Sequence, residues 1–222
     1  GNRAADVGCD HGFVPIFLVE SGISPLAVAA DVRPGPLSRA KEHIKEHRLE
    51  EKIQTRLSDG LANIKPGEAD SLIMSGIGGI LMMRLLQDEE HTAKSFKELI
   101  LSPQSELFDV RRYLVSNGYL IEYEHMLCDE GKYYFIFHVL VKKDEREWSE
   151  EEYRYGKDIC KDDMKTFLAY LEKEERQYEQ ILEKMKQAPE NDRAAQRIAQ
   201  LHQDITCLKK RRQLVYDCGC FA

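Results

Sequence analysis

The sequence lacks the long apolar run that a membrane helix needs, because no stretch reaches the roughly 18 consecutive apolar residues of a membrane span. It also lacks a recognisable signal peptide. Both absences favour a cytoplasmic protein with no membrane partner, and we expect a monomer. The first residue is Gly1 rather than methionine and a strand pattern begins at once, so we expect a native N-terminal segment to be missing.

Cysteine is sparse, with six residues in a chain of 222, and the six are scattered. Such scatter argues against a disulfide framework and favours free thiols in a reducing cytosol. Cys218 and Cys220 could hold a soft metal, but no histidine or second cysteine pair stands near them. We therefore expect no metal site. The cysteines are Cys9, Cys128, Cys160, Cys207, Cys218 and Cys220.

An excess of positive charge is also missing, since the formal net charge is −7. An acidic chain does not bind nucleic acid through its overall charge, so any such contact must come from local basic clusters. The clusters present are Arg111-Arg112, Lys142-Lys143, Lys184 with Lys186, and Lys209-Lys210-Arg211-Arg212.

What the sequence does have is a regular alternation of strand and helix patterns over residues 1–143. Alternation of this kind predicts a parallel sheet with right-handed crossovers. Two adjacent strands joined at Asp129-Glu130-Gly131 come last, which predicts a mixed, Rossmann-like α/β sheet with one reversed strand. The expected strands are Arg3–Val7, Ala27–Val32, Gln54–Leu57, Ser71–Ser75, Leu99–Ser102, Tyr119–Cys128 and Lys132–Lys142. The expected helices are Phe13–Ser21, Pro36–His47, one that follows Gly79 and runs through Leu86, and Ser105–Ser116.

After residue 143 the composition changes, and Glu, Lys, Gln and Arg dominate. Apolar residues recur at alternating spacings of four and three, which is the seam of a coiled coil. Pro189 ends the first helix, and Asn191 or Asp192 caps the second. We expect residues 144–218 to form a projecting antiparallel coiled-coil hairpin; the alternative is that both helices pack on the sheet. Glu174 and Arg212 fill the two polar positions of the seam, and its other members are Cys160, Met164, Phe167, Leu171, Tyr178, Ile181 and Met185, then Ala194, Ile198, Leu201, Ile205, Leu208 and Val215.

The turn after the first strand reads Asp6-x-Gly8-x-x-x-Gly12. A dinucleotide fingerprint needs a middle glycine, and Asp10 stands in its place. A carboxylate beside a pyrophosphate at a helix N-terminus is repulsive. A cationic ligand without phosphate fits better, and S-adenosylmethionine, with its sulfonium and ammonium groups, is such a ligand.

Two further acids, Asp31 and Asp59, end or follow the second and third strands. Because the carboxyl ends of successive parallel strands share one crevice, Asp6, Asp31 and Asp59 should face one site. Asp31 can accept from both ribose hydroxyls, and Asp59 from an adenine amino group. The alternative for each acid is a helix cap, but three in register favour a cofactor site.

Six stretches resemble the bacterial tRNA (adenine-22-N1)-methyltransferases. The predicted helical hairpin is similar to the C-terminal coiled coil of that family, and the stretches cover essentially the whole α/β part. The Asp-His-Gly triplet, the Gly-Pro-Leu turn and the Gly-Ile-Gly-Gly loop are together more specific than a general methyltransferase motif. The stretches are "ADVGCDHGFVP", "AADVRPGPLSRAKEHI", "RLSDGL", "SGIGGILM", "LSPQSELFDVRRYL" and "GKYY".

The resemblance implies a class I S-adenosylmethionine-dependent fold that methylates N1 of an adenine in the D-loop region of tRNA. Two departures exist: the upstream helix of the family is absent, and Ile77 replaces the methionine usual in the glycine loop. The expected cofactor-binding residues are Asp6, Gly8, Cys9, Gly12, Asp31, Val32, Asp59, Gly60, Ser75 and Gly76.

The expected catalytic residues are Asp10 and His11. Adenine N1 carries no proton at neutral pH, so the main task is to hold it in line with the methyl group and the sulfur. The methylated base is cationic, and the Asp10 carboxylate could stabilise that charge or instead bind the ammonium group of the cofactor. His11 could donate to substrate or cofactor, or hold the backbone of the turn.

On the substrate side, glycines replace the Asp/Asn-Pro-Pro-aromatic motif of amino-group methyltransferases, which disfavours exocyclic-amine chemistry and lets backbone approach a flat base. Gln104 can present an amide to a base edge. Tyr134 could stack on RNA, although core packing is the default for it and for Tyr133. The expected substrate-binding residues are Ile77, Gly78, Gln104, Tyr134, Lys209, Lys210 and Arg211.

Two other functions stay open. One is an S-adenosylmethionine-dependent methyltransferase acting on another RNA or a small molecule. The other is a non-catalytic coiled-coil adaptor on a relic fold, which the intact acids at Asp6, Asp31 and Asp59 argue against.

Overall fold

The computed structural model describes residues 1–159, 161–186 and 192–217. The chain groups into two compact units. The α/β unit comprises residues 1–123 and 134–145, and the helical unit comprises residues 124–133 and the described residues from 146 onward. Cys160, the predicted helix break at Gln187–Asn191, and the pair Cys218 and Cys220 lie outside the described residues.

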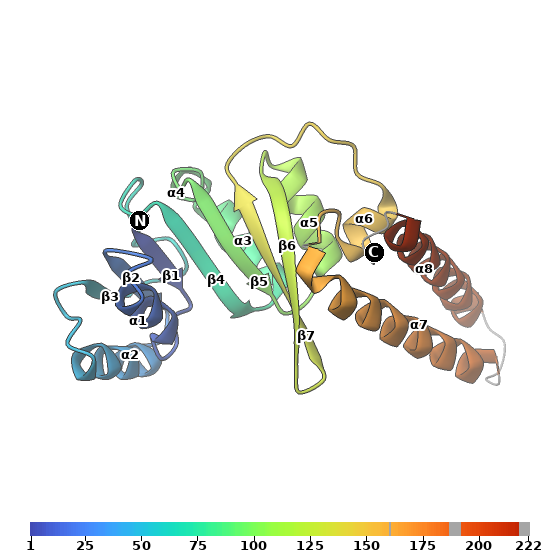
Figure 1. Cartoon of the computed structure of the whole chain (residues 1–222), viewed down its shortest axis with the longest axis horizontal. Coiled ribbons are helices and arrows are strands. Elements are labelled where there is room, and N and C mark those ends of the chain that lie inside the picture. The colour runs from blue at the N-terminus through green and yellow to red at the C-terminus, as the bar shows by residue number, and fades with distance from the viewer. Residues whose placement is uncertain (160, 187–191, 218–222) are drawn as a thin grey trace. The chain divides into compact units, whose positions relative to one another are not determined.

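The sheet has seven strands in the order β3-β2-β1-β4-β5-β7-β6. Strands β1 to β5 run parallel, and β7 pairs antiparallel with β5, which confirms the expected mixed sheet (Figure 1). The strand order reverses beside β1, so the carboxyl ends of β1 and β4 flank a crevice where such sheets bind ligands. The strands are β1 (Ala4–Val7), β2 (Ala27–Asp31), β3 (Ile53–Leu57), β4 (Ser71–Ile77), β5 (Glu98–Pro103), β6 (Leu120–Asp129) and β7 (Lys132–Leu140).

Five helices belong to the α/β unit. Small strand residues such as Ala4, Ala27 and Ala29 let α1 and α2 pack closely on one face of the sheet, where they bury Ile16 and Ile44. Side chains of alternate strand residues point to the other face, where α3 packs against β4 and α5. The helices are α1 (Phe13–Glu20), α2 (Pro34–Glu46), α3 (Gly79–Asp88), α4 (Glu90–Ala93) and α5 (Leu107–Ser116), of which α4 was not expected.

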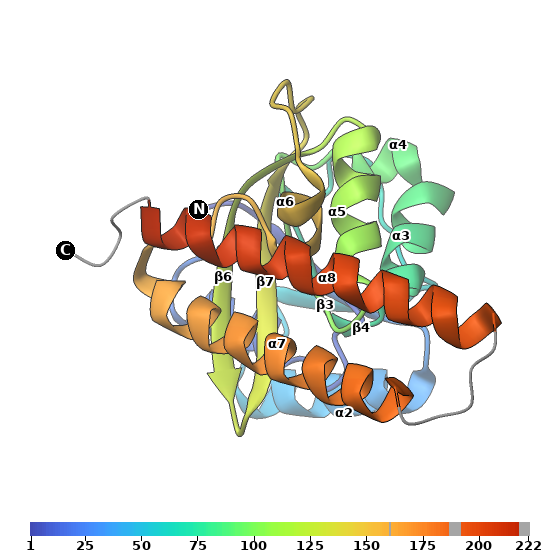
Figure 2. The same ribbon diagram turned by 90° about the vertical axis from the view of Figure 1, so that its right-hand side faces the viewer.

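The helical unit contains α6 (Glu150–Tyr155), the 3₁₀ turn η1 (Lys161–Asp163), α7 (Met164–Lys186) and α8 (Asp192–Asp217). Helix α6 was not expected; a capping box between Ser149 and Glu152 begins it. Helices α7 and α8 lie antiparallel along each other (Figure 2), as the seam predicts.

The seam is buried at Phe167, Leu171 and Leu201, but the prediction is wrong at Ile181, which is exposed while its neighbour Leu182 is buried. A straight α-helix has 3.6 residues per turn, so its buried face drifts from a strict seven-residue repeat. The shift moves the buried stripe by one residue toward the end of α7.

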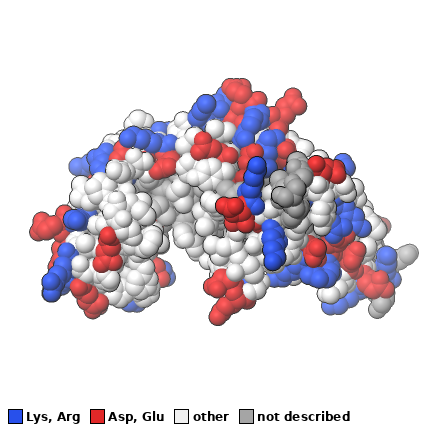
Figure 3. Space-filling view, viewed as in Figure 1, with Lys and Arg blue, Asp and Glu red and all other residues white. Residues whose placement is uncertain are grey.

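One face of the molecule carries a largely uncharged area. In Figure 3, acidic and basic side chains are mixed over the helical unit and over the outer part of the α/β unit, whereas the surface over β4 is largely uncharged. No helix within the described residues is long and apolar enough to cross a membrane.

Candidate active site

A cleft of about 690 Å³ opens at the carboxyl ends of the parallel strands of the α/β unit. It brings together ten of the residues expected from the sequence, and it adds six that were not expected. The expected lining residues are Gly8, Asp10, Asp31, Val32, Asp59, Gly60, Ser75, Gly76, Ile77 and Gln104; the others are Val7, Arg33, Ser58, Leu81, Arg84 and Leu85.

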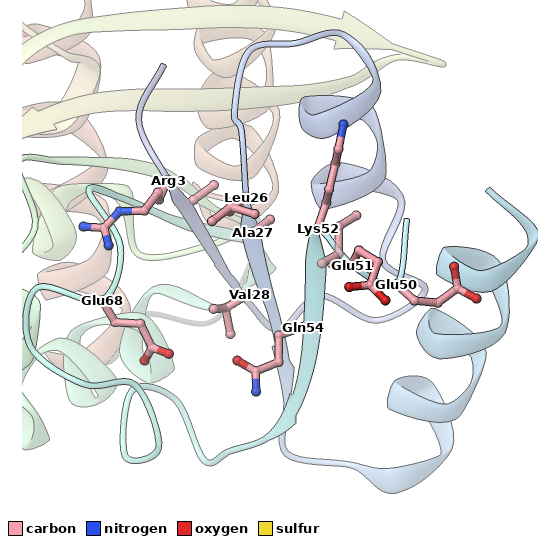
Figure 4. Close-up of a pocket in the computed structure, with 11 residues that line it drawn as sticks. Arg3, Leu26, Ala27, Val28, Glu50, Glu51, Lys52, Gln54 and Glu68 are labelled. Atoms are coloured by element: carbon pink, nitrogen blue, oxygen red, sulfur yellow. The ribbon is translucent and has the colours of Figure 1, made fainter. Parts of the chain in front are cut away.

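A smaller hollow of about 270 Å³ lies at the opposite ends of β1, β2 and β3 (Figure 4). Its charged groups do not converge: Lys52 extends away from Arg3 in Figure 4, and Glu68 is taken up by a two-bond pair with Arg56 at 2.7 and 2.8 Å. Glu68 is therefore held by Arg56 and is not available to a ligand in this hollow.

The turn between β1 and α1 is shaped by three left-handed residues, Gly8 (φ 82°), Asp10 (φ 45°) and Gly12 (φ 74°). The Gly8 amide donates to Ala30 O at 2.9 Å, which ties the turn to β2. A Cβ on Gly12 would stand 3.0 Å from the Ala40 Cβ, so glycine also permits α1 to approach α2. The turn thus exposes the Gly8 backbone to the cleft.

Asp31 is the polar anchor of the cleft floor. Its side chain is only 4 % exposed, and its carboxylate accepts from the Arg33 amide at 2.8 Å and the Asp10 amide at 3.3 Å. The Arg33 guanidinium lies 3.7 Å from the same carboxylate. Each carboxylate oxygen has a further lone pair, so Asp31 can hold both neighbouring turns and still accept from a bound diol.

Asp10 stands at the cleft edge, with its side chain 52 % exposed. Its two carboxylate oxygens face nitrogens of two side chains, His11 Nε2 at 3.5 Å and Arg39 Nη2 at 3.7 Å. His11 itself does not line the cleft; its ring stacks on Phe13, and its backbone oxygen accepts from His43 Nδ1 at 2.9 Å. The structure therefore places His11 beside Asp10 rather than in the cavity.

Asp6 and Cys9 lie behind the cleft wall and do not line it. Asp6 is 3 % exposed, and its Oδ2 has no hydrogen-bond partner among the described residues. Burial, with the nearby charge of Asp31, raises the pKa of Asp6 to about 7. Burial followed by the charges of Asp6 and Asp31 raises the pKa of the Cys9 thiol to about 12, which makes Cys9 a neutral packing residue.

The third acid, Asp59, is exposed and lies 3.7 Å from Arg84 Nη2 of α3. The next residue, Gly60, has φ 56°, and a Cβ there would stand 2.5 Å from Leu85 Cδ2. Only glycine lets this turn close against α3. The sequence did not predict that Arg84 and Leu85 line the cleft. The signal was present, because the spacing of Leu81, Arg84 and Leu85 after the glycine loop puts all three on one helix face.

The glycine loop after β4 forms the far wall. Gly76 (φ 76°) lies at a register shift between β4 and β5, and the backbone N–H of Gln104 donates to Ile77 O at 2.9 Å. A Cβ on Gly79 would stand 2.5 Å from Ser105 O, so the loop packs directly on the β5 exit. Gly78 supports this wall without lining the cleft.

The remaining expected residues do not line the cleft. Tyr134 is half-buried on β7, and Lys209 lies 3.4 Å from Glu175 in the helical unit, near exposed Lys210. Arg211 is 9 % exposed; its Nη2 donates to Lys157 O at 2.9 Å, and its guanidinium covers the Phe167 ring.

Arg211 therefore departs from the expectation of an RNA phosphate contact. It lies four residues after Cys207 and four before Val215, and both are buried. The same helical spacing turns Arg211 inward.

Comparison with known proteins shows which family the chain belongs to. The model of the tRNA (adenine(22)-N(1))-methyltransferase family matches residues 4–210. This chain belongs to that family. The match runs through both the cleft and α8, so the predicted family and its S-adenosylmethionine-dependent tRNA (adenine-N1)-methyltransferase activity are confirmed.

Individual relatives agree with this assignment. The tRNA (adenine(22)-N(1))-methyltransferase of Bacillus subtilis is 26 % identical over 216 residues, which are 95 % of this chain and 90 % of the relative. The crystal structure of the B. subtilis enzyme has a TM-score of 0.84, with 25 % identity over 96 % of this chain and 92 % of the other.

Streptococcus pneumoniae Sp1610 in complex with S-adenosyl-L-methionine has a TM-score of 0.82, with 29 % identity over 96 % of this chain and 92 % of the other. A solved relative of this family therefore holds the cofactor that the sequence predicts.

Proposed function

We propose that the cleft of the α/β unit binds S-adenosylmethionine and that its methyl group passes to N1 of adenine 22 in tRNA. The observation that carries the proposal is the gathering of Asp10, Asp31 and Asp59 around one 690 Å³ cleft at the carboxyl ends of parallel strands. Such a crevice is where open α/β sheets bind their ligands.

The lining suits a ligand that carries positive charge and no phosphate. Arg33 and Arg84 both face the cleft, but each lies 3.7 Å from an aspartate, Asp31 and Asp59 respectively. A pyrophosphate would have to compete with these carboxylates, whereas a sulfonium or ammonium group gains from them. When bound, S-adenosylmethionine supplies an electrophilic methyl group on a positively charged sulfur.

Different lining residues would bind different parts of S-adenosylmethionine. Asp31 accepts from the ribose hydroxyls through the lone pairs that the amides of Asp10 and Arg33 leave. Asp59 accepts from the adenine amino group of the cofactor, and the Cβ-free edge of Gly8 lets the ligand lie against the backbone.

Asp10 stabilises the positive charge that develops on the methylated adenine. Its exposed carboxylate at the cleft edge can reach a base that enters from outside, and His11 and Arg39 lie loosely beside it. The target base lies against the Gly76–Gly79 loop, and the exposed Gln104 presents its amide to the base edge. Lys209 and Lys210 contact tRNA phosphates, and we drop buried Arg211 from this set.

The deciding experiment is methyl transfer from labelled S-adenosylmethionine to bulk tRNA, followed by digestion and identification of the labelled nucleoside. We expect 1-methyladenosine, mapped to position 22. Label in an exocyclic amino group, in another RNA or in small molecules only would contradict the proposal, and the heat-denatured protein is the control.

We further propose that the enzyme acts in the cytoplasm as a monomer. Cys9, Cys128 and Cys207 are free thiols, as a reducing compartment permits. Light scattering on the purified protein tests the monomer directly.

A further inference from the structure

Three aromatic rings form a stack beside the cleft, and the proposed chemistry uses none of their faces. Phe13 stacks on His11 at 5.6 Å and on His43 at 4.9 Å between ring centroids, with interplanar angles of 9° and 16°. His11 and His43 stack on each other at 5.8 Å. His43 Nδ1 donates to His11 O at 2.9 Å, which fixes the ring from α2 relative to the turn before α1.

The stack is open to solvent. Phe13 is 62 % exposed at the first position of α1, although a phenylalanine gains most from burial. The centroids of His11 and His43 lie only 5.8 Å apart, so the two imidazoles stand side by side and do not enclose Phe13. An exposed ring held beside two imidazoles is a surface on which another flat ring can stack. We call the rings of His11, Phe13 and His43 the ring platform.

A cation stands at the cleft end of the platform. Arg39 and His43 are four residues apart on α2 and so share one helix face. Arg39 Nη2 lies 3.7 Å from Asp10 Oδ1, with both side chains about half exposed, so the guanidinium is free to turn to a phosphate. Asp10 lines the cleft, which places the platform and Arg39 directly beside its mouth.

We propose that the ring platform and Arg39 bind a nucleotide that flanks the target adenine, the base stacking on Phe13 and its phosphate meeting Arg39. This inference rests on the proposed function, since it presumes a tRNA substrate. Aromatic faces interleaved with cations are the chemistry by which proteins hold unstacked bases, and the target adenine must leave its own stack to reach the cleft. A docked neighbour holds the strand open while the adenine enters.

The test compares Phe13→Ala with Phe17→Ala, because Phe17 is 61 % exposed on the same helix and lies outside the platform. Affinity for unmodified tRNA is measured by filter binding, and affinity for S-adenosylmethionine by calorimetry. We expect Phe13→Ala to weaken tRNA binding roughly 5- to 100-fold, with cofactor affinity unchanged. Phe17→Ala should bind tRNA as the unaltered protein does, and Phe13→Tyr should restore binding. Arg39→Gln should lower the salt dependence of binding by about one phosphate contact.

Three results would overturn the inference. Phe13→Ala could bind tRNA normally, Phe17→Ala could lose as much affinity as Phe13→Ala, or Phe13→Ala could lose turnover alone, which would make the rings a support for Asp10. If the unaltered protein neither binds nor methylates tRNA, the proposed function itself fails before the variants are compared.

Discussion

The carboxylates of the cleft and those of the helical unit differ in exposure and in the distance to their cationic partners. In the cleft, Asp10 and Asp59 keep more than half of their side-chain surface open, and their arginine partners stand 3.7 Å away. In the helical unit, Glu175 is buried against Arg212 and Lys209, and buried Asp204 lies 3.0 Å from Arg154. Exposed carboxylates with distant partners are available to a ligand, whereas buried carboxylates with close partners hold helices together.

The sharpest way to break this contrast is Asp31→Ala, which removes the one cleft acid that is both buried and a candidate ligand. The two hydrogen bonds that the ribose hydroxyls would donate to Asp31 are together worth roughly 3–6 kcal/mol. We therefore expect kcat/KM for methyl transfer to fall about 10²- to 10⁴-fold. Isothermal titration with S-adenosylmethionine should show a matching loss.

The control for Asp31→Ala is Glu50→Ala, which removes an exposed carboxylate from the smaller hollow at the other end of the strands. Equal losses in the two variants would mean that the effect is general rather than tied to the cleft.

The second test uses the buried, unpartnered carboxyl of Asp6. Its pKa in the folded protein is about 7 against an ordinary 3.8, so between these values the folded state holds a proton that the unfolded state releases. The free energy of unfolding therefore falls as pH rises through this window, by up to about 4 kcal/mol. Asp6→Asn cannot ionise and should lose this fall, as measured by urea unfolding from pH 4.5 to 8 and followed by circular dichroism.

Parallel stability–pH curves for the two proteins would show that Asp6 ionises freely in the folded state. The single tryptophan, Trp148, lies in the helical unit and gives a separate fluorescence signal for that unit. We expect the pH profile of the Trp148 transition to be the same in both proteins.

The third test separates the two tasks open to Asp10. Asp10→Asn keeps the shape of the side chain and removes its charge, so turnover at saturating S-adenosylmethionine should fall about 10- to 100-fold, with cofactor affinity changed only slightly. Single-turnover kinetics and calorimetry on one preparation give both values. Lost cofactor affinity with normal turnover at saturation would assign Asp10 to the ammonium group instead.

The smallest expected effect is on the helical side. Glu175→Ala leaves Arg212 and Lys209 without their carboxylate, but both cations are partly exposed and recover water. We expect a loss of about 1–2 kcal/mol, below the cost of breaking a fully buried pair. Trp148 fluorescence in urea measures it, and S-adenosylmethionine affinity should stay the same. A loss of cofactor affinity as large as the loss of stability would remove the contrast between the units.

The sequence was most informative where periodicity decides the structure. Alternating strands and helices give the sheet, and acids at strand ends give the cleft, because both follow from local pattern and parallel topology. Helices α4 and α6 were missed because four and six residues are too short to show a helical period. The place of Arg84 and Leu85 in the cleft depends on how α3 packs over the turn at Gly60, and no local sequence pattern predicts that packing.

Arg211 shows the limit most clearly. The heptad spacing puts Arg212 on the inner face of its helix, yet Arg212 is partly exposed. The residue before it, Arg211, is the buried one, held by Lys157 O and the Phe167 ring. Sequence gives the charge of a residue, and only packing decides which way the residue faces.

The carboxylate of Asp31 has a thermodynamic consequence of its own. It accepts from the Asp10 amide, so the group that would receive the ribose also fixes the turn that carries Asp10. A nucleoside bound at Asp31 orders the turn that carries Asp10 before a second ligand binds there. The conformational entropy of the turn is then lost only once for the two ligands. Adenosine and a separate methionine-like fragment should therefore bind this cleft with positive cooperativity, each raising the affinity for the other.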